Sequence, residues 1–107
     1  MPYFGSYFER QPGEVLVQVH SRILSGETMR EIQNRLTAIA ADPGVHTVYL
    51  DMDEVEYLSD AFLFMLVQVH KKLKSRNSRL RLRNLPPQSY EVFHWYFMKL
   101  DEEPDIE

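Results

Sequence analysis

Apolar and polar residues alternate at the start of the chain, and this pattern predicts a β-hairpin. We expect strands at Tyr3 to Glu9 and at Val15 to Ile23, where valines at every second position share one face. Between them, Gln11 to Glu14 reads Gln-Pro-Gly-Glu, which is typical of a tight turn.

Later stretches have the period of a helix instead. Apolar residues recur at helical spacing from Met29 to Ile39, between a Ser25-Gly26 start and an Asp42-Pro43-Gly44 stop. A second helix is expected from about Asp60 to Ser75 and a third from Gln88 to Leu100.

Two more strands are expected between these helices, at Thr47 to Met52 and at Arg79 to Leu85. The order ββαβαβα implies parallel strands joined by right-handed crossovers. Because polar residues alternate along the strands, one face of the sheet should stay polar. We therefore predict an α/β fold: a four-stranded mixed sheet with about three helices on one face. Residues 1–100 form a single domain and residues 101–107 an acidic tail.

The second helix has an unusual polar side. Its core face is expected to carry Phe62, Leu66, Val69 and Leu73, whereas Phe64 falls on the opposite side. An exposed ring there is either a stray apolar residue or a contact for a partner. Asp60 and Gln68 share this side, and Ser59 is a plausible N-cap of the helix. We predict Ser59, Asp60, Phe64 and Gln68 as partner-binding residues.

The stretch Tyr49-Leu50-Asp51-Met52-Asp53-Glu54-Val55-Glu56-Tyr57-Leu58-Ser59-Asp60-Ala61-Phe62-Leu63 resembles the signature of STAS domains, the family of bacterial anti-sigma factor antagonists. In that family a strand ending in Leu-Asp-Leu leads through a short loop to Asp-Ser-Ser-Gly at the start of a helix. The pattern of elements agrees along nearly the whole chain. The resemblance implies a switchable protein-binding module, whose central serine is phosphorylated by a partner anti-sigma kinase.

This chain departs from the family pattern at two positions. Asp60 takes the place of the phosphate acceptor, and Leu24 takes the place of an aspartate after the second strand. Asp60 could mimic the phosphorylated state, although a carboxylate carries about one charge and a phosphate nearly two. Alternatively the domain binds without a switch. Ser59 could also be a shifted phosphorylation site, although its use as a cap competes with that role.

Composition narrows the classes of function. The chain has no cysteine and no apolar run long enough to span a membrane, so we expect a cytoplasmic protein without membrane insertion. Its net charge is −4, and a general nucleic-acid role is disfavoured because phosphate binding needs a basic surface. The alternating Arg79, Arg81 and Arg83 are more often a solubilising stripe than a binding site, and they could instead pair with the acidic tail.

An enzyme or nucleotide binder is the alternative from another class. Carboxylates cluster from Asp51 to Glu56, where an α/β protein could hold a cation or acid-base groups. No nucleophile or glycine-rich phosphate loop accompanies the cluster, and the four histidines lack a metal-ligand spacing. We therefore expect no catalysis, cofactor or metal.

These observations predict a non-catalytic interaction module in bacterial signalling or transcription regulation. Its partner would be an anti-sigma factor or serine kinase, or another STAS protein. A homodimer remains open, because the last predicted helix has aromatic residues on more than one side: Tyr90, Phe93, Trp95, Tyr96 and Phe97. An accessory subunit of a larger machine, such as a transporter, is the second binding hypothesis.

Overall fold

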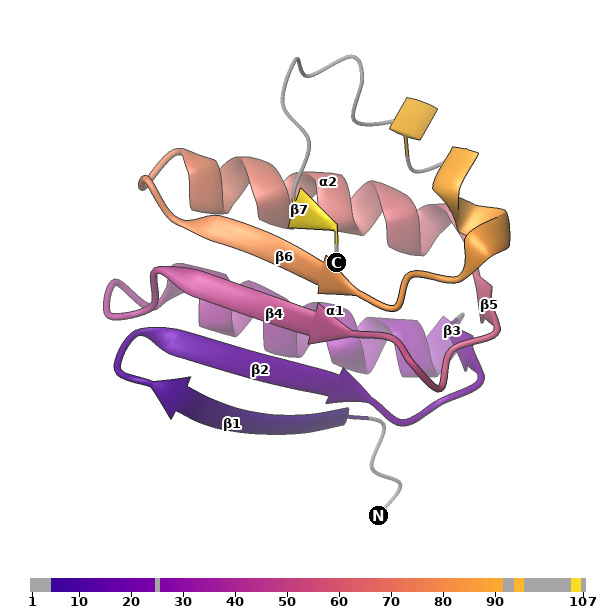
Figure 1. Ribbon diagram of the computed structural model, residues 1–107, viewed down its shortest axis with the longest axis horizontal. Coiled ribbons are helices and arrows are strands. Elements are labelled where there is room, and N and C mark those ends of the chain that lie inside the picture. The colour runs from indigo at the N-terminus through magenta and orange to yellow at the C-terminus, as the bar shows by residue number, and fades with distance from the viewer. Residues whose placement is uncertain (1–4, 25, 92–93, 96–104, 107) are drawn as a thin grey trace.

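The main sheet is mixed, with one antiparallel strand at its edge. The computed structural model describes residues 5–24, 26–91, 94–95 and 105–106. The sheet has the order β1-β2-β4-β6-β7; β1 pairs antiparallel with β2, and the other neighbours are parallel (Figure 1). The strands are β1 Gly5–Gln11, β2 Glu14–Val19, β4 Thr47–Asp51, β6 Arg79–Arg83 and β7 Asp105–Ile106.

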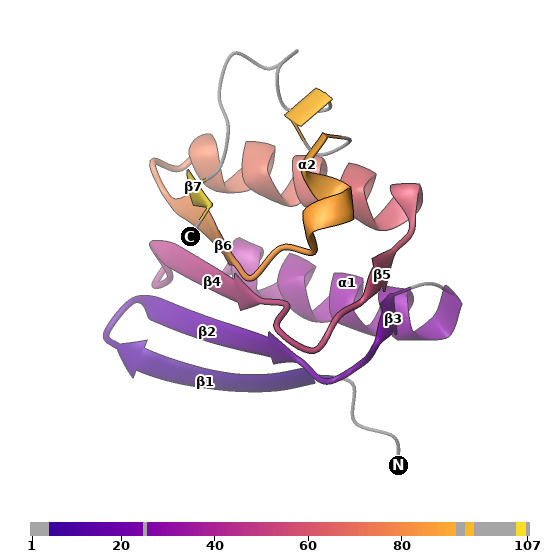
Figure 2. The same cartoon turned by 45° about the vertical axis from the view of Figure 1, so that its right-hand side comes forward.

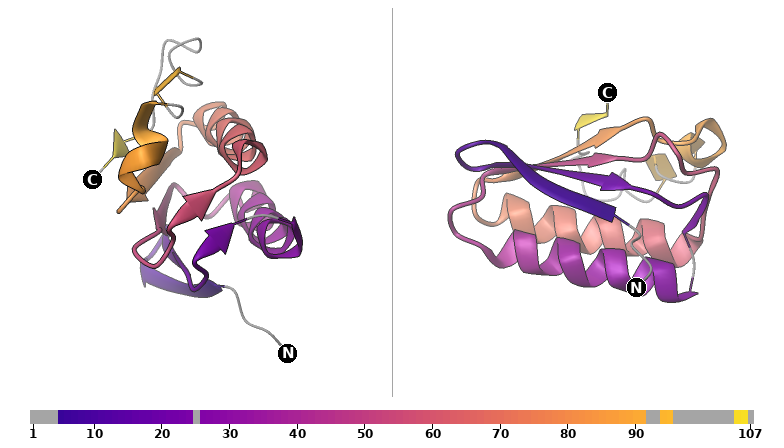
Figure 3. Two further views of the ribbon diagram at one scale, coloured as in Figure 1. Left: turned by 90° about the vertical axis from the view of Figure 1, so that its right-hand side faces the viewer. Right: turned by 90° about the horizontal axis from the view of Figure 1, so that it is seen from below.

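Two α-helices, α1 Gly26–Ala41 and α2 Asp60–Lys74, lie side by side on the same face of this sheet. Figure 3 shows the two layers from below, with both helices running along the strands. Their apolar stripes meet the inward valines and leucines of the strands, and Leu36, Leu50, Phe62 and Leu66 are fully buried in this core. The predicted helix periods and the single-faced covering by these helices are thus confirmed.

A separate two-stranded sheet closes one end of the molecule. It consists of β3 Ile23–Leu24 and β5 Tyr57–Leu58, which pair in parallel (Figure 2). The expected strand Val15 to Ile23 is therefore two elements, and the chain turns between them after Val19. Strands of two residues are too short to show alternation, which explains why the sequence pattern did not separate them.

The predicted strand count needs correction, and the third predicted helix is described only in part. The main sheet has five strands instead of four, because two residues of the acidic tail, Asp105–Ile106, pair with Arg81 and Leu82 of β6. The expected helix from Gln88 to Leu100 lies largely outside the described residues. Its described part begins with a 3₁₀ turn, η1 Pro87–Ser89. Residues 90–91 and 94–95 are helical as well, and α1 and α2 are the α-helices that lie wholly within the described ranges.

The face of the sheet away from the helices is less open than the alternation predicted. Leu16 and Tyr49 are neighbours on this face, yet their exposed fractions are only 7% and 8%. The guanidinium groups of Arg81 and Arg83 lie over the ring of Tyr49, at 5.6 and 5.5 Å from its centre. Arg81 and Arg83 therefore cover an apolar patch on this face, and cation–π attraction supports the contact.

Candidate functional site

The start of α2 is held by Ser59, the residue before the first helical position. Its backbone is extended, at φ −77° and ψ 157°, and its Oγ accepts a hydrogen bond from the Phe62 backbone N–H over 3.2 Å. The same hydroxyl donates to Sδ of Met29 in α1 over 3.4 Å. The expected N-cap is confirmed, and the hydroxyl also ties the starts of the two helices together.

Asp60 is the first residue of α2 and its side chain is exposed. The free N–H groups of a first helical turn give this end a partial positive charge, which favours a carboxylate. Asp60 thus presents its carboxylate to solvent at the start of α2.

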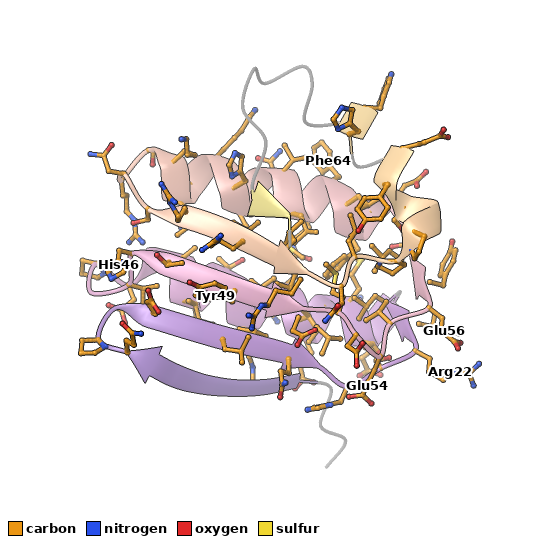
Figure 4. The ribbon with its side chains drawn as sticks, viewed as in Figure 1. Arg22, His46, Tyr49, Glu54, Glu56 and Phe64 are labelled. Carbon is orange, nitrogen blue, oxygen red and sulfur yellow. The ribbon has the colours of Figure 1, made fainter. Side chains whose placement is uncertain are left out.

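Phe64 lies one turn after Asp60, on the outer side of α2. Its exposed fraction is 55%, and Figure 4 places its ring on the helical layer, away from the open sheet face. It borders a groove of about 600 Å³ between the two helices. The groove is lined by Met29, Gln33, Thr37 and Ala40 of α1 and by Ala61, Phe64, Met65, Gln68, Val69, Lys71 and Lys72 of α2.

The four residues predicted for partner binding therefore occupy one face of the molecule. Phe64 and Gln68 line the groove itself. Ser59 and Asp60 lie at its beginning, next to Ala61 and Met29. The contribution of α1 to this surface was not evident from the sequence, because Met29 fits equally well into a core stripe.

The acidic loop after β4 is organised around Asp51, whose Oδ1 accepts two hydrogen bonds. One comes from the Asp53 backbone N–H over 3.1 Å, and the other from Nδ2 of Asn84 over 2.9 Å. Asn84 has φ 57°, a left-handed conformation that asparagine tolerates. Asp51 thus joins the ends of β4 and β6 and has a structural use.

The other carboxylates of this loop face separate partners. Glu54 contacts Nδ1 of His20 at 2.5 Å, and Glu56 accepts a hydrogen bond from Nε of Arg22 over 2.8 Å. Figure 4 shows Arg22, Glu54 and Glu56 together at the end of the sheet opposite His46. In the part of the chain that the structure describes, no three potential ligands gather to hold a metal ion.

The end of the molecule formed by β3 and β5 carries a second exposed apolar surface, a pair of residues that sequence reasoning missed. Ile23 and Tyr57 lie opposite each other in the two strands, with exposed fractions of 55% and 54%. Their neighbours Leu24 and Leu58 are buried. Leu24 is fully buried in the core, which gives a physical reason for an apolar residue at this position.

The exposed aromatics near the C-terminus include Tyr90 and Trp95. The remaining aromatic residues of the predicted last helix, Phe93, Tyr96 and Phe97, lie outside the described residues. None of the helices of the described ranges is long and apolar enough to cross a bilayer.

The fold and the sequence together define the class of protein. The family model of the STAS domain matches residues 8–106, so this chain belongs to the STAS domain family. No curated protein matches the sequence.

Solved structures with the same fold include anti-sigma factor antagonists and part of a transporter. SpoIIAA in its unphosphorylated form superposes with a TM-score of 0.77 at 14% identity, covering 96% of this chain and 86% of that one. An anti-sigma factor antagonist from Mycobacterium paratuberculosis gives 0.72 at 18% identity, covering 91% and 80%. The structure of SLC26A9 gives 0.70 at 17% identity, covering 87% of this chain but only 18% of that protein. At these identities the similarity concerns the fold.

Proposed function

We propose that this protein is a non-catalytic protein-binding module of the anti-sigma factor antagonist type, and that it acts in the bacterial cytoplasm. The partner surface is the first half of α2 with the adjoining groove. The observation that carries this proposal is the exposed Phe64 ring, which lies one turn after Asp60 and beside a largely apolar groove. The partner is an anti-sigma factor or serine kinase, or another STAS protein.

Asp60 determines how this module is regulated. A permanent carboxylate at the helix start supplies part of the charge that phosphorylation would add, so the domain either mimics the phosphorylated state or binds without a switch. Ser59 is poorly placed to be phosphorylated, because its Oγ already accepts the capping hydrogen bond and contacts Met29. Mass spectrometry after coexpression with an anti-sigma kinase tests this point. Phosphate on Ser59 would contradict the unswitched interpretation.

Two aromatic residues of nearly equal exposure allow a matched test of the surface. Phe64→Ala should weaken binding to a purified partner at least about tenfold, as removal of a central aromatic contact commonly does. Tyr57→Ala removes a ring of similar exposure from the β3–β5 end and should change binding by less than about threefold. The reverse result would move the partner surface to Tyr57 and Ile23. Asp60→Ser should alter affinity without loss of fold.

A second candidate is an accessory domain that docks on a larger machine such as a transporter. The fold match to a small part of SLC26A9 supports it. Under this hypothesis the partner is a membrane protein, and crosslinking in native cells should place Phe64 against it instead of against an anti-sigma factor or kinase. A thermal-shift screen with nucleotides and divalent ions tests the enzyme alternative. A large specific shift would count against a purely protein-binding role.

A further inference from the structure

The exposed side of α2 has an ordered sequence of charges. Asp60, Phe64, Gln68 and the pair Lys71 and Lys72 follow one another at steps of three or four residues, and all are exposed. They therefore form one line along the helix, called here the α2 stripe. It is negative where α2 begins, apolar and neutral in its middle, and positive where α2 ends.

The wall of the groove formed by α1 adds no charge to this sequence of charges. Its four residues, Met29, Gln33, Thr37 and Ala40, are all uncharged and recur at helical spacing along α1. The charged Glu31 and Arg35 of α1 line a different depression, together with Asp42. Along the described lining of the groove, the charges are those of Lys71 and Lys72, with Asp60 next to its opening.

The groove has the dimensions of a helix-binding site. Its residues on α2 run from Ala61 to Lys72, which at a rise of about 1.5 Å per residue gives a length of roughly 16 Å, or three helical turns. Its walls are two parallel helices whose side chains repeat every three to four residues. Such ridges accept the ridges of a third helix better than the two-residue repeat of a strand.

We propose that the groove binds an amphipathic partner helix antiparallel to α2. Acidic residues in the first turn of that helix lie over Lys71 and Lys72, apolar residues in its middle pack beside Phe64, and basic residues in its last turn face Asp60. The antiparallel direction follows from the helix dipoles, because acidic residues are favoured at the start of a helix and basic residues at its end. This inference rests on the proposed function, since it specifies the partner for the same surface.

Two synthetic peptides test the direction and the charge order. Both have about fifteen residues, the same composition and the same apolar positions; one has glutamates in its first turn and lysines in its last, and the other has them exchanged. A covalent bridge on the outer side gives both the same helicity, which circular dichroism verifies. Binding to the full chain is measured by fluorescence anisotropy at low and high salt.

The peptide with lysines first can match the charges of the α2 stripe only by binding parallel to α1 and α2, with like ends of the helix dipoles side by side. We therefore expect the peptide with glutamates first to bind about tenfold more tightly at low salt, with the difference shrinking as salt screens the charges. Phe64→Ala should weaken both peptides. The triple variant Asp60→Lys, Lys71→Glu, Lys72→Glu changes only exposed residues and should invert the preference. Equal binding of the two peptides, absence of binding, or an unchanged preference in the triple variant would overturn the inference.

The affinity of the natural partner for variants of this chain distinguishes a failure of this inference from a failure of the proposed function. If the affinity for the natural partner falls with Phe64→Ala but not with the double variant Lys71→Glu, Lys72→Glu, the proposed partner surface is correct. The inference of a partner helix with an acidic first turn is then wrong. If neither substitution matters, the partner surface itself is wrong. Circular dichroism and urea unfolding confirm that each variant retains its fold.

Discussion

Ser59 at the start of α2 donates a hydrogen bond from Oγ to Sδ of Met29 in α1, over 3.4 Å. The contact joins residues 30 positions apart and brings the beginnings of both helices to one place. The groove opens directly beside it, between Met29 and Ala61. The cap that starts α2 therefore also fixes the width of the proposed partner surface at that end.

Ser59→Ala removes the side-chain acceptor for the Phe62 N–H, which also donates to the Ser59 backbone carbonyl over 3.1 Å, and it removes the contact to Met29. We expect the free energy of unfolding to fall by about 1 kcal/mol, the usual effect of losing a side-chain cap. Ser59→Asp retains an oxygen acceptor at this position and should lose much less. Urea denaturation of the three proteins measures the difference. Equal loss in both variants would show that Met29, and not the cap, is the important partner.

Asp51→Ala should destabilise the protein by about 2 kcal/mol, because a half-buried carboxylate that accepts two hydrogen bonds is lost. Asp53→Ala is the control; it removes an exposed carboxylate but keeps the backbone N–H that donates to Asp51, and should change stability by less than about 0.5 kcal/mol.

Asn84→Gly tests the other partner of Asp51, since glycine accepts the left-handed backbone and lacks the amide. A double-mutant cycle of Asp51→Ala with Asn84→Gly should give a coupling energy of at least about 0.5 kcal/mol. Additive effects would contradict the assigned hydrogen bond.

Gly13 and Gly26 both have positive φ, at 83° and 57°, but only one of them is crowded among the described atoms. A Cβ on Gly13 would clash with Cδ2 of His46, whereas a Cβ on Gly26 meets nothing within 4 Å. Gly26→Ala should therefore cost about 1 kcal/mol from backbone strain alone, and Gly13→Ala about 2 kcal/mol or more. Thermal or urea unfolding compares them. A Gly13 variant as stable as the Gly26 variant would show that the imidazole moves aside freely.

Phe64→Ala and Leu66→Ala compare an exposed and a buried position on the same helix. Leu66 is fully buried in the core, so its truncation should cost about 3 kcal/mol through lost contacts and a cavity. Phe64 is more than half exposed, and its truncation should cost less than about 1 kcal/mol. Urea unfolding measures both. A large loss for Phe64→Ala would mean that its ring stabilises the helix pair and that its binding effect is indirect.

Local patterns predicted much of the architecture. The sequence predicted α1 and α2 because their buried stripes repeat every three to four residues within one helix. It predicted β2, β4 and β6 because apolar and polar residues alternate within each of these short segments. The cap at Ser59 follows from residues only three positions apart, so it too could be read from the sequence.

Features that depend on distant pairing could not be read in this way. The β3–β5 sheet joins Ile23 to Tyr57, and β7 pairs Asp105–Ile106 with β6, through segments of two residues that carry no period. The near-complete burial of Tyr49 depends on arginines of the neighbouring strand, whose side chains the sequence suggested would be solvated.

The sequence by itself determined the STAS family pattern, the covering of the sheet by α1 and α2, and the placement of Asp60 and Phe64 at the start of α2. The tertiary structure decided that Met29 and the uncharged side of α1 face Phe64, and that Asp51 is bound by Asn84. The physical reason is distance along the chain. Periodicity and capping arise from neighbours within one or two turns, whereas a groove or a loop bridge exists only after the sheet has brought the ends of separate elements together.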